Sequence, residues 1–349
     1  MKKLLVILGP TSTGKTDLGL NCAKKFNGEL IACDSRQVYK KLDIGTGKLP
    51  SNFLPFAGAK LKGLDIGIGK LPGHKVRVEK GKGFWEMDGV KIWMYDVADT
   101  KNQYTVFDYV RDANRAIDEI LKKGKLPIIV GGTGLYLKAL LEGLPNLDIP
   151  INRSLRRRLE KLSKEELQKE LQQISSDKWE SLNGSDRQNP RRLIRAIELV
   201  SINDINTTAV GLMSTVGGKK LQTDMLKIGL TAPRKVLYQR IDKRVISRID
   251  QGMIDEAKRL HKEGLSFERM RQLGLEYGVL ADYLEGKITS IEELIKIMQG
   301  KIHGYARRQL TWFKKEEKVF WFDITEDGWQ GRVESRVRSW YYSTHDKKN

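Results

Sequence analysis

The chain has 349 residues, 40% of them hydrophobic and 31% charged, which is enough to bury a large core and to form more than one domain. Its 63 lysines and arginines exceed its 44 aspartates and glutamates, and the formal net charge of +19 favours a polyanionic partner such as nucleic acid over solubility alone. The first apolar run, residues 4–8, is too short for a membrane span and lacks the features of a secretory signal, so we expect a cytoplasmic protein. Two cysteines and four histidines without metal-ligand spacing favour neither a disulfide framework nor a structural metal site.

The first part of the chain alternates between strand and helix patterns. Residues 4–8 are typical of a buried strand, a helix is predicted over 16–26, and a second short strand is predicted over 29–35. A helix over 106–123 and a strand over 126–134 repeat this order. Continuous apolar strands that alternate with helices predict an α/β fold, with a parallel sheet covered by helices on both faces.

The middle of the chain is strongly basic, and its sequence pattern predicts helices. Residues 152–174 show helical spacing with an apolar stripe and a dense basic face, and a polar break over 175–190 precedes another helix over 191–200. The stripe consists of Leu155, Leu159, Leu162, Leu167 and Leu171. Residues 232–313 are again mostly helical by pattern, so the basic segment is predicted to be a helical insertion in the α/β core. The predicted organisation is an α/β core over 1–144, the insertion over 145–189, a mostly helical continuation of the core over 190–325 and a tail over 326–349.

One short text is nearly repeated. Residues 41–50, KLDIGTGKLP, recur as GLDIGIGKLP at 63–72, and the second copy lies in a Gly- and Lys-rich excursion over 60–91 that we expect to be β-rich or mobile. Our hypothesis is that only the first copy lies at the functional site, so that changes at Gly67 and Lys70 are harmless.

The tail carries four aromatic residues among basic ones. Trp329, Trp340, Tyr341 and Tyr342 could stack on RNA bases, or they could pack a terminal helix against the core. We favour packing, because aromatic side chains more often serve burial.

A phosphate-binding loop follows the first strand. The text GPTSTGKT fits the pattern G-x-x-x-x-G-K-[ST] and lies between a strand and a helix, as this loop requires. The glycines let backbone N–H groups converge on phosphate oxygens, while the lysine neutralises the terminal phosphate and the threonine hydroxyl can hold Mg²⁺. A kinase, an NTPase and a diphosphate-releasing transferase can all use such a loop, so the loop alone leaves the reaction open. The predicted phosphate-binding residues are Gly9, Pro10, Thr11, Ser12, Thr13, Gly14, Lys15 and Thr16, with Thr16 as the metal ligand.

Polar residues follow two other predicted strands at the same edge of the sheet. Asp34 ends the second strand, and ligands bind at the carboxyl ends of strands in open α/β sheets. Its carboxylate could bind Mg²⁺ through water, act as a general base, or only cap a helix. The Gly-rich text 131–134, which contains Thr133, permits close approach of a ligand, although a tight strand–helix turn needs the same residues.

Two basic clusters lie on predicted helices. Arg192 and Arg195 share a helix face and suit RNA phosphates or a diphosphate, with a solvated basic face as the alternative. The segment 240–244, which includes Arg244, presents the same choice.

Several motifs occur together in a fixed order. The texts GPTSTGKT, DSRQVY, LDIGTGK, GGTGLYLKALLEGL, NPRRLIRAIEL, LYQRIDKRV…QGMIDEAKRL and YARRQLTWF follow one another between Leu4 and Asp323. In this combination the chain resembles the tRNA dimethylallyltransferases, also called tRNA isopentenyltransferases. The resemblance implies a P-loop NTPase-like parallel sheet flanked by helices, with a helical insertion domain.

The resemblance also implies a reaction. Dimethylallyl diphosphate would lie in the P-loop with Mg²⁺, and the N6 amine of an adenosine adjacent to the anticodon would attack the allylic carbon and release diphosphate. By resemblance Asp34 takes the proton from N6, Thr11 assists at the reacting end of the donor, and Arg244 meets the diphosphate.

The resemblance assigns the tRNA contacts to several segments of the chain. The implied tRNA-binding residues are Asp34, Ser35, Arg36, Gln37, Thr133, Asn189, Pro190, Arg191 and Arg192. The basic helix 153–161 of the insertion would meet the backbone of the anticodon stem. We expect a monomer that binds the anticodon stem-loop and no membrane.

Two alternatives to the transferase remain at this point. A P-loop kinase of small molecules or nucleotides would use the same phosphate loop, but DSRQVY and YARRQLTWF are not kinase features. A non-catalytic RNA-binding protein could keep the fold, and the replacement of the usual Thr-Arg-Gln by Ile302-His303-Gly304 leaves that alternative open, although Lys15, Thr16 and Asp34 are intact.

Overall fold

The apolar runs of the sequence form the strands of one mixed sheet. The computed structural model describes residues 2–48, 54–55, 66–71, 74–203 and 223–343. The strands are β1 (Lys3–Leu8), β2 (Gly28–Cys33), β3 (Leu54–Pro55), β4 (Ile66–Leu71), β5 (His74–Gly81), β6 (Phe84–Met87), β7 (Val90–Trp93), β8 (Leu126–Gly131), β9 (Asp224–Thr231) and β10 (Val319–Asp323). Their order in the sheet is β10-β9-β1-β8-β2-β7-β6-β5-β4-β3, with parallel pairs from β10 to β7 and antiparallel pairs from β7 to β3.

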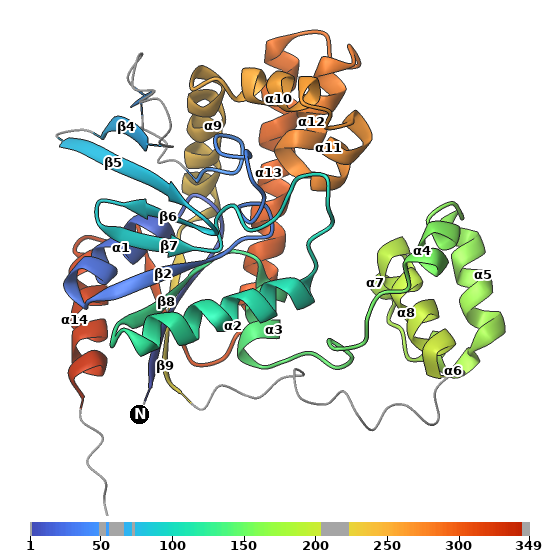
Figure 1. Ribbon diagram of the computed structural model, residues 1–349, viewed down its shortest axis with the longest axis horizontal. Coiled ribbons are helices and arrows are strands. Elements are labelled where there is room, and N and C mark those ends of the chain that lie inside the picture. The colour runs from blue at the N-terminus through green and yellow to red at the C-terminus, as the bar shows by residue number, and fades with distance from the viewer. Residues whose placement is uncertain (1, 49–53, 56–65, 72–73, 204–222, 344–349) are drawn as a thin grey trace, which may run out of the picture. The chain divides into compact units, whose positions relative to one another are not determined.

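Helices cover both faces of the parallel part of this sheet (Figure 1). On one face α1 (Lys15–Lys25) packs closely, because Gly19 leaves room for Leu30 of β2 and Val130 of β8. On the other face α2 (Val106–Lys122) packs through Tyr109, whose hydroxyl donates to the carbonyl of Ala32 and contacts Cys33. Residues 30 and 33 point to opposite faces because side chains alternate along a strand. The predicted α/β fold is therefore confirmed.

The C-terminal third forms a layer of helices, as its pattern predicts. These helices are α9 (Arg234–Asp250), α10 (Met253–Lys262), α11 (Phe267–Leu273), α12 (Leu275–Leu284) and α13 (Ile291–Phe313). Helix α13 buries Leu294, Met298, Ile302 and Ala306 at a spacing of four residues, so one stripe of this helix packs against its neighbours. It contacts α9, α12 and also α3 (Gly134–Leu141), which follows β8. None of the helices in the described ranges has the length and apolar content to cross a membrane.

The tail forms a terminal helix that packs on the core, which agrees with the interpretation we favoured. Helix α14 (Trp329–Tyr342) buries Val333 and Val337, one turn apart. The Tyr341 ring lies 5.4 Å from the ring of Phe26, and the Trp340 indole donates to Asp224 at 2.8 Å. Trp340 and Tyr341 therefore pack on the core, whereas Tyr342 is 61% exposed.

Residues 142–220 form a separate compact unit, and the rest of the chain forms the other. The helices of this second unit are α4 (Arg153–Leu159), α5 (Lys164–Ile174), α6 (Ser176–Glu180), α7 (Gly184–Arg187) and α8 (Pro190–Asn203). Leu159, Leu167 and Leu171 of the predicted stripe are buried together with Leu193 and Ile197 of α8. Because α8 supplies four of the seven buried residues of this core, it belongs to the insertion, and our predicted boundary at residue 189 was too early.

Other differences from the prediction are local. The helical text 152–174 is two helices, because Ser163 and Glu166 form a capping box that starts α5. Strands β9 and β10 were not predicted. The excursion 60–91 is β-rich where it is described, and the second copy of the repeated text contributes β4, although the side chains of Gly67 and Lys70 lie outside the described residues.

Candidate active site

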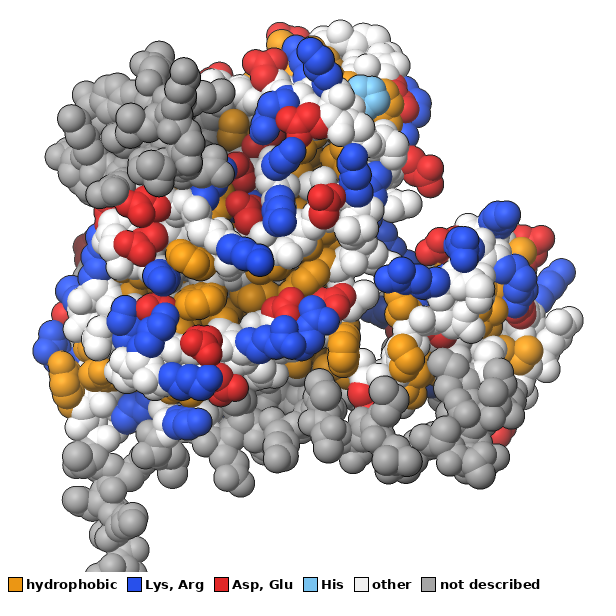
Figure 2. All heavy atoms as spheres, viewed as in Figure 1, with side chains coloured by type: hydrophobic (Ala, Val, Ile, Leu, Met, Phe, Trp, Pro, Cys, Tyr) orange, Lys and Arg blue, Asp and Glu red, His pale blue; other side chains and the backbone are white. Residues whose placement is uncertain are grey.

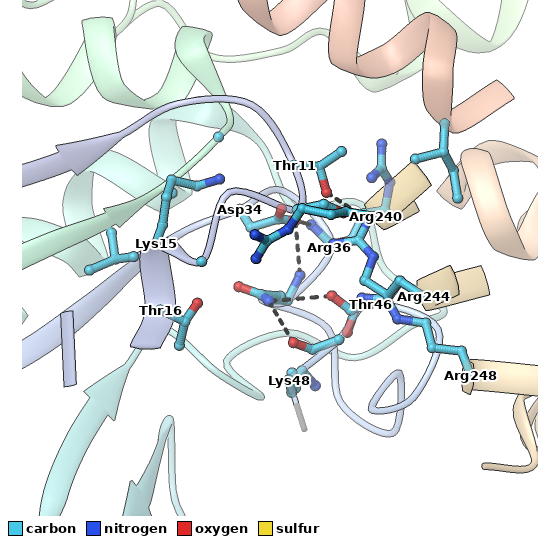
Figure 3. Close-up of a pocket in the computed structure, with 18 of the residues that line it drawn as sticks. Thr11, Lys15, Thr16, Asp34, Arg36, Thr46, Lys48, Arg240, Arg244 and Arg248 are labelled. Carbon is cyan, nitrogen blue, oxygen red and sulfur yellow. Dashed lines mark hydrogen bonds between the residues drawn. The ribbon is translucent and has the colours of Figure 1, made fainter. Parts of the chain in front are cut away.

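Three strand ends meet at one cavity in the larger unit. The P-loop follows β1, Asp34 follows β2, and Gly132 follows β8, and all three line a cavity of about 430 Å³. These strands are neighbours in the sheet, so their carboxyl ends lie at the same edge, where α/β proteins bind ligands. Figure 3 shows the side chains of this cavity converging from the P-loop, the segment after β2 and helix α9.

The backbone of the P-loop adopts the positive φ angles that its glycines allow. Gly9 and Gly14 have φ values of +143° and +84°, and a Cβ at Gly9 would lie 2.3 Å from the carbonyl oxygen of Leu230. The buried Thr13 hydroxyl donates to the carbonyl of Pro10 at 2.9 Å, which closes the turn. Among the residues that the structure describes, no side chain caps the N-terminus of α1, so its first N–H groups are available to an anion.

Positive charge is concentrated around this cavity. Burial and then the charge of Arg244 lower the pKa of Lys15 from 10.5 to about 7. Burial and then the charge of Arg248 lower the pKa of Arg244 from 12.5 to about 9. Such shifts mean that like charges are held together in a desolvated place, and an anion bound among them would relieve the repulsion.

Arg244 joins the P-loop to helix α9. Its Nη2 donates to the hydroxyl of Thr11 at 2.6 Å. The backbone N–H of Thr11 donates to Oε1 of Gln309 at 2.9 Å, and Nε2 of Gln309 donates to the carbonyl of Gly132 at 2.8 Å. The sequence-predicted pair Thr11 and Arg244 is therefore in contact, and Gln309 ties their position to the end of β8.

Asp34 is fixed by the turn that follows it. Its Oδ1 accepts the N–H groups of Arg36 at 2.8 Å and Gln37 at 3.4 Å, so the carboxylate closes a turn and does not cap a helix as we considered. The N–H of Ser35, the residue directly after Asp34, donates to the hydroxyl of Thr133 at 3.1 Å. The residues predicted after β2 and after β8 thus lie together, and Asp34 also faces the cavity.

Three buried polar atoms around the cavity have no hydrogen-bond partner among the described residues. They are Oγ of Ser12, Nε of Arg244 and Oε2 of Glu276. Buried polar atoms are normally paired, so three unpaired ones around a single cavity indicate that a bound molecule completes their contacts.

Several residues of the site were missed by sequence reasoning. Arg248, Glu276 and Gln309 line the cavity, and Glu256 lies behind one of its loops. One signal could have found Arg248. Arg240, Arg244 and Arg248 recur every four residues, which places all three on the same face of α9.

The altered text 302–304 lies at the edge of this site. Ile302 lines the cavity, while the His303 ring stacks on Tyr238 with 3.9 Å between centroids. Nε2 of His303 lies 2.8 Å from a carboxylate oxygen of Asp242 on α9. His303 therefore contributes contacts between α13 and α9.

The remaining predicted residues belong to the second unit, which we describe by itself. Asn189 accepts the N–H groups of Arg191 and Arg192 and so begins α8, where Pro190 takes the first helical position. Arg192 pairs with Asp186, and Arg195 pairs with Glu198. These arginines have protein partners within their unit.

Comparisons with known proteins give a consistent result. Residues 82–316 match the family described as IPP transferase, and residues 2–55 match the one described as isopentenyl transferase. A protein named tRNA dimethylallyltransferase 2 from Treponema denticola is 37% identical over 314 residues, which cover 90% of this chain and 92% of that protein. A tRNA dimethylallyltransferase from Bacillus mycoides is 33% identical, with 93% and 91% covered.

Solved structures agree with these relatives. The tRNA isopentenylpyrophosphate transferase from Bacillus halodurans is 30% identical with a TM-score of 0.63, and the match covers 98% of this chain and 97% of that one. A eukaryotic dimethylallyltransferase acting on tRNA has a TM-score of 0.69 at 23% identity, with 97% and 78% covered, and shows a likeness of fold alone.

Proposed function

Since the chain belongs to the IPP transferase family, we propose that it transfers a dimethylallyl group from dimethylallyl diphosphate to tRNA. The acceptor is N6 of the adenosine that follows the anticodon on its 3′ side, and the products are N6-isopentenyladenosine and diphosphate. One observation carries the proposal: Asp34 and the Thr11–Arg244 pair face the same cationic cavity over the P-loop. The relatives are named transferases of tRNA, so the kinase alternative has no support among them.

The cationic end of the cavity suits the leaving group. When the allylic C–O bond breaks, its electron pair stays on the diphosphate, whose charge increases in the transition state. Lys15, Arg244 and the N–H groups that begin α1 are the donors for that charge. Because they are fixed before the reaction, they lower the barrier without reorganising.

The carboxylate of Asp34 suits the acceptor. The N6 amine forms a bond to C1 of the allyl group and must lose one proton, and an exocyclic amine is a poor nucleophile. Asp34 is a catalytic residue in this proposal, because its carboxylate accepts that proton. The turn that binds Oδ1 keeps the carboxylate aimed into the cavity. The adenosine must leave its stack to reach this place.

The residues present also fit Mg²⁺. Across the described ranges, no group of three or more histidine, cysteine, aspartate or glutamate side chains could hold a metal. Thr16 lines the cavity beside Lys15, and a hydroxyl with diphosphate oxygens forms the oxygen ligand set that Mg²⁺ prefers. When bound there, the ion would neutralise charge on the leaving diphosphate.

Exposed basic residues suit the tRNA backbone. On the second unit Arg153, Arg157 and Lys161 are exposed at a spacing of four residues, and Arg191 is exposed at the start of α8. We assign them to phosphates of the anticodon stem, which give affinity without reading sequence. We further propose that the enzyme works in the cytoplasm as a monomer.

A labelling experiment tests the function. The purified protein is incubated with unmodified bacterial tRNA, Mg²⁺ and either labelled dimethylallyl diphosphate or labelled ATP. We expect prenyl label in tRNA and no ATP turnover. ATP turnover without prenyl transfer would support a kinase, and tRNA binding with neither activity would support the non-catalytic alternative.

A further inference from the structure

The segment Asp43–Lys48, which we call loop 43–48, forms one wall of the cavity. Thr46, Gly47 and Lys48 line the cavity directly. The carbonyl of Gly45 accepts a hydrogen bond from Nη1 of Arg248 at 2.9 Å, and Arg248 is buried and also lines the cavity. The same Nη1 also donates to Oε1 of Glu276 at 3.3 Å, so this carbonyl and Glu276 together set the direction of the Arg248 side chain.

Glu256 of α10 holds the opposite side of this loop. Its Oε2 accepts the N–H groups of Asp43 at 3.0 Å and Ile44 at 2.9 Å. Its Oε1 accepts the N–H of Gly45 at 3.1 Å and the hydroxyl of Tyr277 at 2.6 Å. Three successive N–H groups form an anion-binding concavity, and here a carboxylate of the protein itself, only 4% exposed, occupies it.

The loop has little freedom to move between these contacts. A Cβ at Gly45 would lie 2.7 Å from the hydroxyl oxygen of Tyr277. A Cβ at Gly47, whose φ is +68°, would lie 1.9 Å from Nη2 of Arg248. The backbone is thus packed between Tyr277 on one side and the guanidinium of Arg248 on the other.

We propose that Glu256 is a positioning residue for the transfer reaction, which acts through Gly45 to aim Arg248 at the bound donor. Gly45 is the connecting residue, because its N–H binds Glu256 and its carbonyl binds Arg248. Glu256 itself does not line the cavity. The inference rests on the proposed function only for the identity of the donor.

The substitution Glu256→Gln tests the role with almost no change in volume. A glutamine keeps one acceptor oxygen, but its NH₂ group must face at least one N–H donor of the loop, so the loop shifts. Since misplacement by about 1 Å far from the chemistry can cost about 100-fold, we expect kcat/KM for the prenyl donor to fall about 10- to 100-fold. Asp255→Asn on the same helix is the matched control and should keep full activity, because the Asp255 side chain is 80% exposed.

Two further measurements separate positioning from stability. Calorimetry with inorganic diphosphate should show weaker binding to E256Q, at an unchanged number of sites per folded molecule. In an Arg248→Met background the extra loss from E256Q should shrink to below about threefold, because residues that act through one contact are not additive. Multiplicative losses, or a lower melting temperature with unchanged KM and diphosphate affinity, would overturn the proposal. A wild-type protein that binds diphosphate without prenyl transfer would instead overturn the proposed function, and the calorimetric test of Glu256 would still apply.

Discussion

Lys15 makes diphosphate binding dependent on pH. In the free protein its pKa is lowered to about 7 by burial and by the charge of Arg244. A diphosphate in the P-loop brings negative charge next to the ammonium and raises this pKa again. Below pH 7 the lysine is already charged, and binding takes up no proton. Above pH 7 the lysine is neutral in the free protein, so binding must take up one proton and weakens as the pH rises.

The size of the effect follows from the difference between the pH and the pKa of Lys15. Well above pH 7 each pH unit costs a factor of about 10 in affinity, and because half of the lysine is still charged at pH 7, it contributes about 50-fold less at pH 9 than at pH 7. Diphosphate ionises in the same range, and the variant Lys15→Met serves as the control for this. The ratio of the two dissociation constants, variant over wild type, should fall with pH when measured by calorimetry. A ratio that stays constant between pH 6 and about 9 would refute the argument, because it would mean that Lys15 does not titrate on binding.

Other substitutions distinguish residues that act in catalysis from residues that stabilise the fold. Asp34→Asn should lower kcat about 10²- to 10⁴-fold in the labelling assay because the proton acceptor is lost, while calorimetry shows diphosphate bound at least as tightly, because a negative charge beside Lys15 and Arg244 is removed. Arg244→Gln should lower kcat about 10²- to 10³-fold and also weaken diphosphate binding, since a donor to the leaving group is removed. Leu171→Ala should destabilise the second unit by about 2–5 kcal/mol in denaturant unfolding, because the side chain is fully buried there. The reverse result for Leu171, an unchanged unfolding curve, would contradict the core we describe.

The P-loop could be predicted from the sequence because all of its parts are contiguous. The same holds for Asp34, since a polar residue at the end of an apolar strand is visible in a short window. Gln309 and Glu256 could not be found in this way. Gln309 lies 298 residues from its partner Thr11, and Glu256 lies 211 residues from its partner Gly45. Only the packing of the helices brings these pairs together.

The missed strands also have a physical explanation. Strand β9 carries Lys227 in an otherwise apolar run, and this lysine pairs with Glu316 next to β10. Strand β10 is at the edge of the sheet and exposes Phe320 and Trp321 in part, so it has neither the continuous burial nor the clean alternation that identifies a strand. Pairing with a distant neighbour, rather than local pattern, determines both strands.

The distribution of charge is more informative than the total of +19. Figure 2 shows acidic and basic side chains interspersed over the visible face, and in the second unit Arg156 and Arg195 share the single carboxylate of Glu198. The cavity differs, because seven lysine and arginine side chains line it with only three carboxylates. Concentrating like charges in a desolvated place costs free energy, as the lowered pKa values of Lys15 and Arg244 indicate. Lys48 and Arg248 already have carboxylate partners, and an anion bound beside Lys15 and Arg244 would offset the remaining cost. The cavity's local excess of charge, rather than the charge of the whole chain, therefore argues for a diphosphate substrate.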